Sequence, residues 1–290
     1  MTDAFSRARE FMLCNARLLE RALFHTCFSA ASPGSVAAVV RAYQNPDGGL
    51  GHALEPDFRC PESQPLFAEI GLAALHEAGY RDQQLALSLC PFLEAVADTR
   101  GLVPIALQTA LSSPRARHWS RLPGPGLNPT LGICGLLHYQ QVEHPWLSSA
   151  TQTCCDLLSQ DPPLEAHTLL CATRLVDHLP DRALARRLFD AIAAAIPRSQ
   201  FFIPKAPVEG YGLTPLHFAP SPASPWRELF PTEDLEGHLR DLLGRQQPDG
   251  GWPISWEAPG PGAAYECRGC LTLDAIRTLT AYGCVSVPGP

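Results

Sequence analysis

The sequence predicts an all-α protein in which helical hairpins follow one another along a single domain, residues 1–290. Three observations lead to this prediction. Apolar residues recur at helical spacing through most of the chain, and no run of β-branched residues alternates with polar ones as in strands. One turn motif occurs twice, at residues 44–50 and 246–252. Turn signals recur at intervals of about 50 residues, a length that suits a helical hairpin in a repeat protein.

The repeated turn has a physical explanation. Both copies contain Pro-Asp-Gly-Gly. Proline sets the first corner, the aspartate side chain bonds nearby backbone N–H groups, and glycine permits a positive φ. A glutamine precedes each turn and is suited to bond carbonyl groups left exposed at the end of a helix. Leu50 or Trp252 then follows as an apolar anchor. Two copies between helical segments indicate a repeat.

The helices follow in order from their spacing and their breakers. Residues 4–30 contain no helix breaker, so one long helix is expected there before Pro33. A degraded copy of the turn at residues 98–102 opens a long loop rich in Pro, Gly and Ser. Residues 201–226 are irregular and aromatic. The remaining helices are expected at residues 35–44, 66–78, 83–97, 130–139, 145–159, 164–179, 182–196, 234–245 and 267–282.

Composition narrows the class of protein. Apolar residues make up 46% of the chain and charged residues 18%, which is enough apolar material for a sizeable core. The net charge of −7 gives no indication of a nucleic-acid partner. No apolar run reaches the roughly 18 residues of a membrane span, and the N-terminus lacks the apolar block of a signal peptide. We therefore expect a cytoplasmic location, with the 11 cysteines mostly reduced and buried.

The turn motif resembles that of the terpenoid cyclase/protein prenyltransferase superfamily. Gln-x-x-Asp-Gly-Gly-Trp at residues 246–252 matches the repeat motif of squalene–hopene cyclases and prenyltransferase β-subunits, and residues 44–50 match it with Leu for Trp. The resemblance implies an α/α toroid of about five or six hairpins, with inner helices around a central cavity. It also implies that the chemistry lies at one mouth, on the loops that follow the Gly-Gly turns.

The chain departs from the family's catalytic motifs. It has neither the Asp-x-Asp-Asp acid of class II terpene cyclases nor an Asp-rich magnesium motif. In residues 265–271, Glu266 stands roughly where the prenyltransferases place a zinc-binding His. The resemblance therefore predicts the fold better than it predicts the reaction.

The loop after the first turn is the first candidate site. Pro56, Pro61 and Pro65 stiffen it. Its polar residues are His52, Glu55, Asp57, Arg59, Cys60, Glu62, Ser63 and Gln64. We interpret Asp57 first and Glu55 second as general acid or base, Arg59 as an anion-binding group, and Ser63 as the cap of the next helix. The alternative is a salt-bridged, capped loop with no chemistry.

The loop after the second turn is expected to contribute to the same mouth. Glu266 is a third candidate catalytic carboxylate, and an aromatic wall there suits a carbocation or a sugar face. The candidate binding residues are Trp252, Trp256, Tyr265 and Arg268, with Tyr211 and His217 from the irregular segment. The alternative is a core tryptophan surrounded by surface charge.

Two further patterns are given less functional meaning. Cys267 and Cys270 form one Cys-x-x-Cys, which with Cys60 and His52 makes a formal four-ligand zinc set, whereas structural zinc sites usually show two such pairs. We therefore predict no metal and no cofactor. A basic segment at residues 115–121, with His118 and Trp119, suits either a diphosphate or a solvated loop.

Three functions remain open on the sequence. The first is a small toroidal enzyme of terpene cyclase/prenyltransferase type, a lyase or transferase, that acts on a mainly apolar, isoprenoid-like small molecule by carboxylate acid–base chemistry. The second is a carbohydrate-active α/α-toroid hydrolase or lyase, since those enzymes also use paired carboxylates and aromatic platforms. The third is a non-catalytic ligand-binding module on the same scaffold. The substrate and the oligomeric state are not predicted.

Overall fold

A computed structural model describes residues 3–288 of the chain. Within this range the regular structure consists of helices α1–α12 and short 3-10 segments, and the pairing between extended segments is limited to isolated bridges. The all-α prediction is confirmed for this part of the chain. Over the same residues, no helix has the length and apolar composition needed to cross a membrane.

The chain forms two compact units. One comprises Pro33–Gln200, and the other combines Met1–Ser32 with Phe201–Pro290. We call them the central unit and the terminal unit and describe each by itself. The expectation of one domain stays a prediction.

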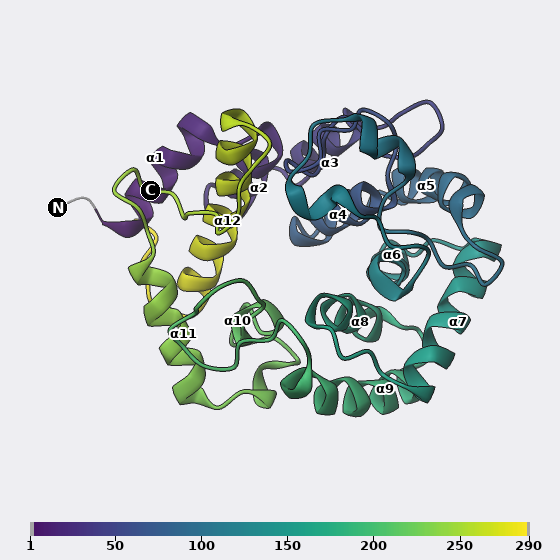
Figure 1. The fold of residues 1–290 in the computed structure, drawn as a ribbon. Helices are drawn as coiled ribbons and strands as arrows, with labels where there is room; N and C mark the ends of the chain where they lie inside the picture. The colour runs from purple at the N-terminus through teal and green to yellow at the C-terminus, as the bar shows by residue number, and fades with distance from the viewer. Residues whose placement is uncertain (1–2, 289–290) are drawn as a thin grey trace. The chain divides into compact units, whose positions relative to one another are not determined.

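The central unit has two layers of helices (Figure 1). In one layer α6 packs between α4 and α8, and in the other α7 packs between α5 and α9. Because α6 has neighbours on both sides, its residues 129–137 are all buried, which explains their uninterrupted apolar and small character. The helices are α3 (Gly34–Arg41), α4 (Pro65–Glu77), α5 (Gln83–Val96), α6 (Leu127–Tyr139), α7 (Pro145–Gln160), α8 (Ala166–His178) and α9 (Arg182–Ala195), with 3-10 segments Gln108–Ser112, Arg117–Ser120 and Ile196–Arg198.

The terminal unit brings the two ends of the chain together. Its long helix α12 packs against α1, α2 and α11 (Figure 1). Aromatic contacts join α1 to α2, where Phe5 lies 5.2 Å from Phe28 between ring centroids. The helices are α1 (Ala4–Asn15), α2 (Leu18–Phe28), α10 (Pro215–Phe218), α11 (Thr232–Gly244) and α12 (Pro261–Ala281), with a 3-10 segment at Arg227–Leu229.

The helices depart most from the prediction at two places. The single helix expected at residues 4–30 is wrong, because Ala16 and Arg17 are extended and separate α1 from α2. No local breaker marks this point. Arg17 instead pairs with Glu20 at 2.5 Å from the N-cap position of α2. The closing helix begins at Pro261 rather than near Cys267, with proline in the first turn, where its missing N–H costs nothing.

The two copies of the turn have the same hydrogen bonds. In the first, Gly48 N–H donates to the Asn45 carbonyl at 3.0 Å, and Gly49 N–H donates to the Asp47 carboxylate at 3.0 Å. In the second, the corresponding pairs are Gly250 with Gln247 at 2.9 Å and Gly251 with Asp249 at 3.1 Å. The preceding glutamines also act alike: Gln44 and Gln246 donate to the carbonyls of Gly48 and Gly250 at 2.9 and 3.0 Å. The two turns therefore share one hydrogen-bond pattern, and the repeat as a whole stays a prediction.

Each turn also docks onto another helix in the same way. Gly48 and Gly250 have φ of 87° and 89°, and a Cβ at either position would overlap a helix carbonyl, that of Ser88 on α5 or that of Arg7 on α1. The degraded copy at residues 98–102 also lies close to a helix, since a Cβ at Gly101 would come within 3.3 Å of Ala150 on α7. The glycines thus provide both the turn conformation and the close approach to a helix backbone.

Candidate functional site

The loop after the first turn is held rigid by its backbone. His52 and Ala53 both have positive φ, of 57° and 61°, and their N–H groups donate to the Pro61 and Cys60 carbonyls at 3.0 and 2.9 Å. The loop is also tied to residues 114–116. Ala116 N–H donates to the Asp57 carbonyl at 2.8 Å, and Arg59 N–H donates to the Pro114 carbonyl at 2.9 Å. A side chain on this loop therefore keeps a defined position.

Asp57 and His118 form the most suggestive polar pair of the central unit. The Asp57 residue is 3% exposed, whereas the His118 side chain is 50% exposed. His118 Nε2 lies 3.6 Å from Asp57 Oδ2, and Glu55 Oε1 accepts a hydrogen bond from Asp57 N–H at 3.3 Å. A buried carboxylate beside an accessible imidazole is an arrangement that can orient the ring.

Aromatic rings adjoin this pair. Phe58 is fully buried and stacks on Trp119, with centroids 5.3 Å apart and planes 11° from parallel. His118 packs against the same indole at 5.3 Å. The buried Trp119 Nε1–H has no hydrogen-bond partner among the residues that the structure describes. A buried donor without a partner is costly, so it is a natural point for a ligand acceptor or a water molecule.

Two predicted binding residues, Gln64 and Cys60, make contacts that hold the loop in place. Gln64 is fully buried and accepts a hydrogen bond from Leu107 N–H at 2.7 Å, while its amide nitrogen donates to Cys60 Sγ at 3.2 Å. Burial raises the pKa of the Cys60 thiol to about 11, and the adjacent Glu62 carboxylate adds to the shift. Cys60 therefore stays a neutral thiol at physiological pH.

Ser63 does not cap the following helix as predicted. Helix α4 begins at Pro65 with Gln64 at the N-cap, and no side chain bonds there. The Ser63 hydroxyl instead donates to Asp47 at 2.7 Å and accepts from Asn45 at 3.0 Å. These contacts tie the loop back to the turn that precedes it.

In the terminal unit, Arg268 holds the second turn against α12 and α1. It donates to the Asp249 carboxylate at 2.7 Å and to the Trp252 carbonyl at 3.2 Å, and its guanidinium lies 4.6 Å from the Phe11 ring centroid. Trp252 is buried, and its indole N–H donates to the Leu242 carbonyl at 2.8 Å. Both side chains therefore have structural contacts that account for their presence.

The remaining predicted residues of this unit differ in exposure. Tyr211 is 58% exposed and meets Trp256 edge to face, with centroids 6.4 Å apart. His217 Nδ1 accepts from Thr214 N–H at 2.9 Å and so caps the short helix α10. Tyr265 is exposed and Glu266 half-exposed, both near the beginning of α12.

The Cys-x-x-Cys pair lies within α12. Cys267 is buried, and Cys270 Sγ donates to the Glu20 carboxylate at 3.3 Å, where Glu20 also pairs with Arg17. Within either unit taken by itself, the described residues include no group of three or more His, Cys, Asp or Glu ligands close enough to share an ion.

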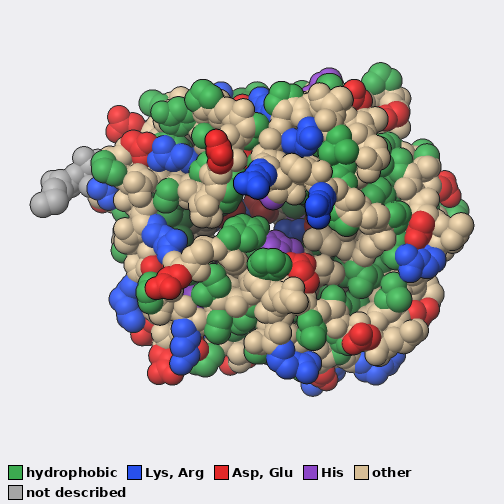
Figure 2. All heavy atoms as spheres, in the orientation of Figure 1, with side chains coloured by type: hydrophobic (Ala, Val, Ile, Leu, Met, Phe, Trp, Pro, Cys, Tyr) green, Lys and Arg blue, Asp and Glu red, His purple; other side chains and the backbone are tan. Residues whose placement is uncertain are grey.

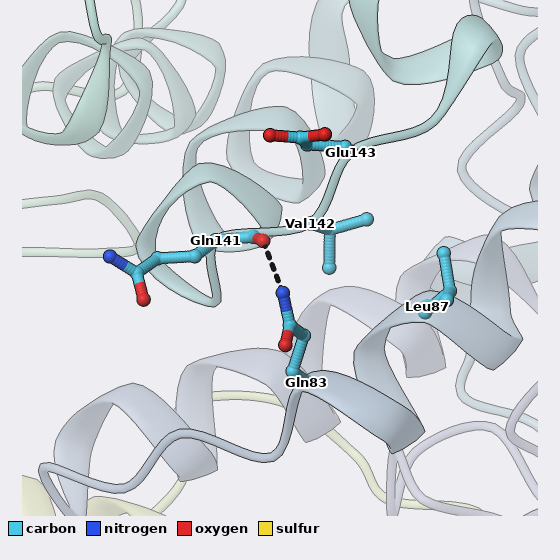
Figure 3. A pocket seen from close by; sticks show the side chains of 5 residues that line it. All are labelled: Gln83, Leu87, Gln141, Val142 and Glu143. Atoms are coloured by element: carbon cyan, nitrogen blue, oxygen red, sulfur yellow. Dashed lines mark hydrogen bonds between the residues drawn. The ribbon is translucent and has the colours of Figure 1, made fainter.

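Two surface features add little to the site. Acidic and basic side chains alternate over the face shown in Figure 2, without a large patch of one sign on that face. A shallow hollow of about 430 Å³ lies beside α5, where Gln83 donates to the Gln141 carbonyl at 2.6 Å (Figure 3). None of the predicted site residues lines this hollow.

Comparison with models of known protein families gives no match for this chain, and comparison with curated proteins gives none either.

The structure thus assigns a partner that the sequence interpretation did not give. Asp57 was predicted as the leading carboxylate, but His118 appeared only as part of a basic segment. The isolated bridge between Phe58 and Arg115 brings the two segments together. The only sequence signal for His118 is that it stands next to Trp119 in a segment whose other charged residues are arginines.

Proposed function

We propose that this protein is an enzyme in which Asp57 and His118 act as an acid–base pair on a small molecule. The observation that carries the proposal is the buried Asp57 carboxylate 3.6 Å from the half-exposed His118 imidazole. In this arrangement His118 exchanges the proton with the substrate, and Asp57 orients the ring. Glu55 and Arg59 are the neighbouring groups proposed to bind the polar part of the substrate.

The proposed substrate is mainly apolar and isoprenoid-like. Support comes from the Phe58–Trp119 stack next to the acid–base pair, because aromatic faces suit apolar chains and developing positive charge. The terpene cyclase/prenyltransferase resemblance supplies the isoprenoid class. The finer architecture, an α/α toroid, belongs to the same proposal and is supported by turns that dock onto a helix in the same way in each unit.

A carbohydrate-active enzyme is the second candidate. It is favoured by the exposed aromatic side chains of the terminal unit, where Tyr211 adjoins both Trp256 and the half-exposed Phe201. Such a surface suits stacking against sugar rings. In a carbohydrate-active enzyme Asp57 would still be a catalytic carboxyl group, since glycoside cleavage also requires one.

The test compares Asp57→Asn and His118→Gln with the wild type, and uses His25→Gln, a histidine in the last turn of α2 outside the candidate site, as the control. The full-length protein is incubated with isoprenoid diphosphates and alcohols and, separately, with oligosaccharides, and products are identified by mass spectrometry. We expect turnover of the isoprenoid class, reduced about 10²–10⁴-fold in the two site variants and unchanged in the control.

Circular dichroism and thermal melts separate a catalytic role from a structural one. If Asp57→Asn and His118→Gln lose several kcal/mol of stability while retaining turnover per folded molecule, the pair is a structural clamp and the proposal fails. Turnover of oligosaccharides alone would favour the second candidate, and ligand binding without turnover in the wild type would indicate a binding module.

A further inference from the structure

Three helix ends meet at the side of the central unit where α4, α6 and α8 finish. His76 is the penultimate residue of α4, Tyr139 the last residue of α6, and His178 the last residue of α8. Because α6 packs between the other two helices, the three side chains come together. The candidate catalytic loop precedes α4, so these residues lie at the opposite end of that helix.

The two imidazoles approach each other through their Nε2 atoms. The distance between His76 Nε2 and His178 Nε2 is 3.1 Å. Tyr139 packs against both rings, with centroids 4.6 Å from His76 and 5.2 Å from His178, and so helps to fix their planes. Two neutral imidazoles can share one proton at this distance, or both Nε2 lone pairs can be directed to one metal ion.

The separation fits metal coordination. With metal–nitrogen bonds of about 2.0–2.1 Å, two nitrogens 3.1 Å apart subtend an angle of about 98° at the ion. This value lies between the angles of octahedral and tetrahedral coordination, so the separation of the two nitrogens suits a shared ion. Imidazole is a preferred ligand of zinc, copper, nickel and iron.

Some of the surrounding charges favour a bound cation and others oppose it. Helix C-termini carry partial negative charge, and three of them converge here, which favours a cation. The Arg81 guanidinium lies 5.1 Å from the Tyr139 ring centroid, and Arg182 donates to the carbonyl of Asp177, next to His178. These two positive groups weaken cation binding, so the expected site is of modest affinity.

We propose that His76 and His178 form a bis-imidazole site for a divalent transition-metal ion, with water in the remaining coordination positions. With only two protein ligands, the metal is expected to exchange readily. The proposal replaces the prediction of no metal at this one place. It is independent of the acid–base pair and of the cysteines.

The test is a cobalt(II) titration of the full-length protein, followed by its visible and near-ultraviolet spectrum. Imidazole and water ligation gives weak d–d bands, whereas binding to exposed cysteines adds intense thiolate charge-transfer bands. Loss of an outer-shell partner of a metal ligand already costs about 10–100-fold in affinity, so His76→Asn and His178→Asn should each weaken binding at least tenfold. His25→Asn, a histidine in the last turn of α2, is the matched control and should leave the affinity unchanged.

A fourth variant keeps the proposal testable if the histidine variants fold poorly. Arg182→Gln removes an exposed positive charge and should strengthen cobalt binding by about 1.5- to fivefold, the size of effect expected for an exposed charge. The proposal is overturned if the wild type gives only thiolate-type bands, if the His76 and His178 variants bind cobalt as the wild type does, or if Arg182→Gln leaves the affinity unchanged.

Discussion

Replacing the first glycine of each repeated turn by alanine should be far more destabilising than an ordinary surface change. Gly48 and Gly250 have φ of 87° and 89°, a conformation that costs an L-residue about 1–2 kcal/mol. A Cβ at either position also overlaps a helix carbonyl oxygen, which adds an overpacking cost of about 1–3 kcal/mol. We therefore expect Gly48→Ala and Gly250→Ala each to lower the free energy of unfolding by about 2–5 kcal/mol.

Gly79 provides the matched control. It has φ of 65° at the end of α4, but an added Cβ would meet no atom within 4 Å. Gly79→Ala should therefore cost only the conformational part, about 1–2 kcal/mol. Urea unfolding followed by circular dichroism measures all three variants. If Gly48→Ala costs no more than Gly79→Ala, the close docking of the turn onto α5 contributes nothing, and the reasoning is wrong.

Two further predictions concern charged side chains that are buried or partly buried. Glu69→Gln should lower stability by about 3 kcal/mol, because it leaves the Arg174 guanidinium, its partner at 2.5 Å, without a charged partner, and adding Arg174→Met should recover part of the loss in the same unfolding assay. Equal losses in the single and double variants would contradict this. For Glu165, burial raises the pKa, but the hydrogen bonds from His167 and Thr168 lower it by more, so that the pKa is about 2 instead of the usual 4.5. Because the pKa is lower in the folded than in the unfolded protein, the ionised carboxylate stabilises the fold above pH 4.5, and this stabilisation is lost as the pH falls toward 2. For this one-third exposed side chain we expect the contribution to the free energy of unfolding to be about 1–2 kcal/mol. The stability difference between wild type and Glu165→Gln should shrink over that pH range, and a constant difference would refute the assignment.

The sequence predicted only part of the candidate site. Asp57 was identified because a proline-stiffened loop after a repeated turn concentrates polar groups. Its partner His118 was not, because the contact depends on how two loops pair, and loop pairing leaves no periodic signal. The proposed ligand roles of Cys60, Ser63 and Gln64 illustrate the converse. Their residue types suit substrate binding, but their hydrogen bonds are made within the loop and hold it in place.

The sequence by itself determined the helices and the turns, because helical periodicity, Pro-Asp-Gly-Gly and its glutamine act through contacts only a few residues apart. Tertiary structure decided the break between α1 and α2, where Gly269 of α12 approaches Ala16 so closely that a Cβ there would lie 2.9 Å from the Ala16 Cβ. It also decided that His76 meets His178 and that Asp57 meets His118. These pairs join separate helices or loops, and their distances are set by the packing of whole elements, which no short stretch of sequence encodes.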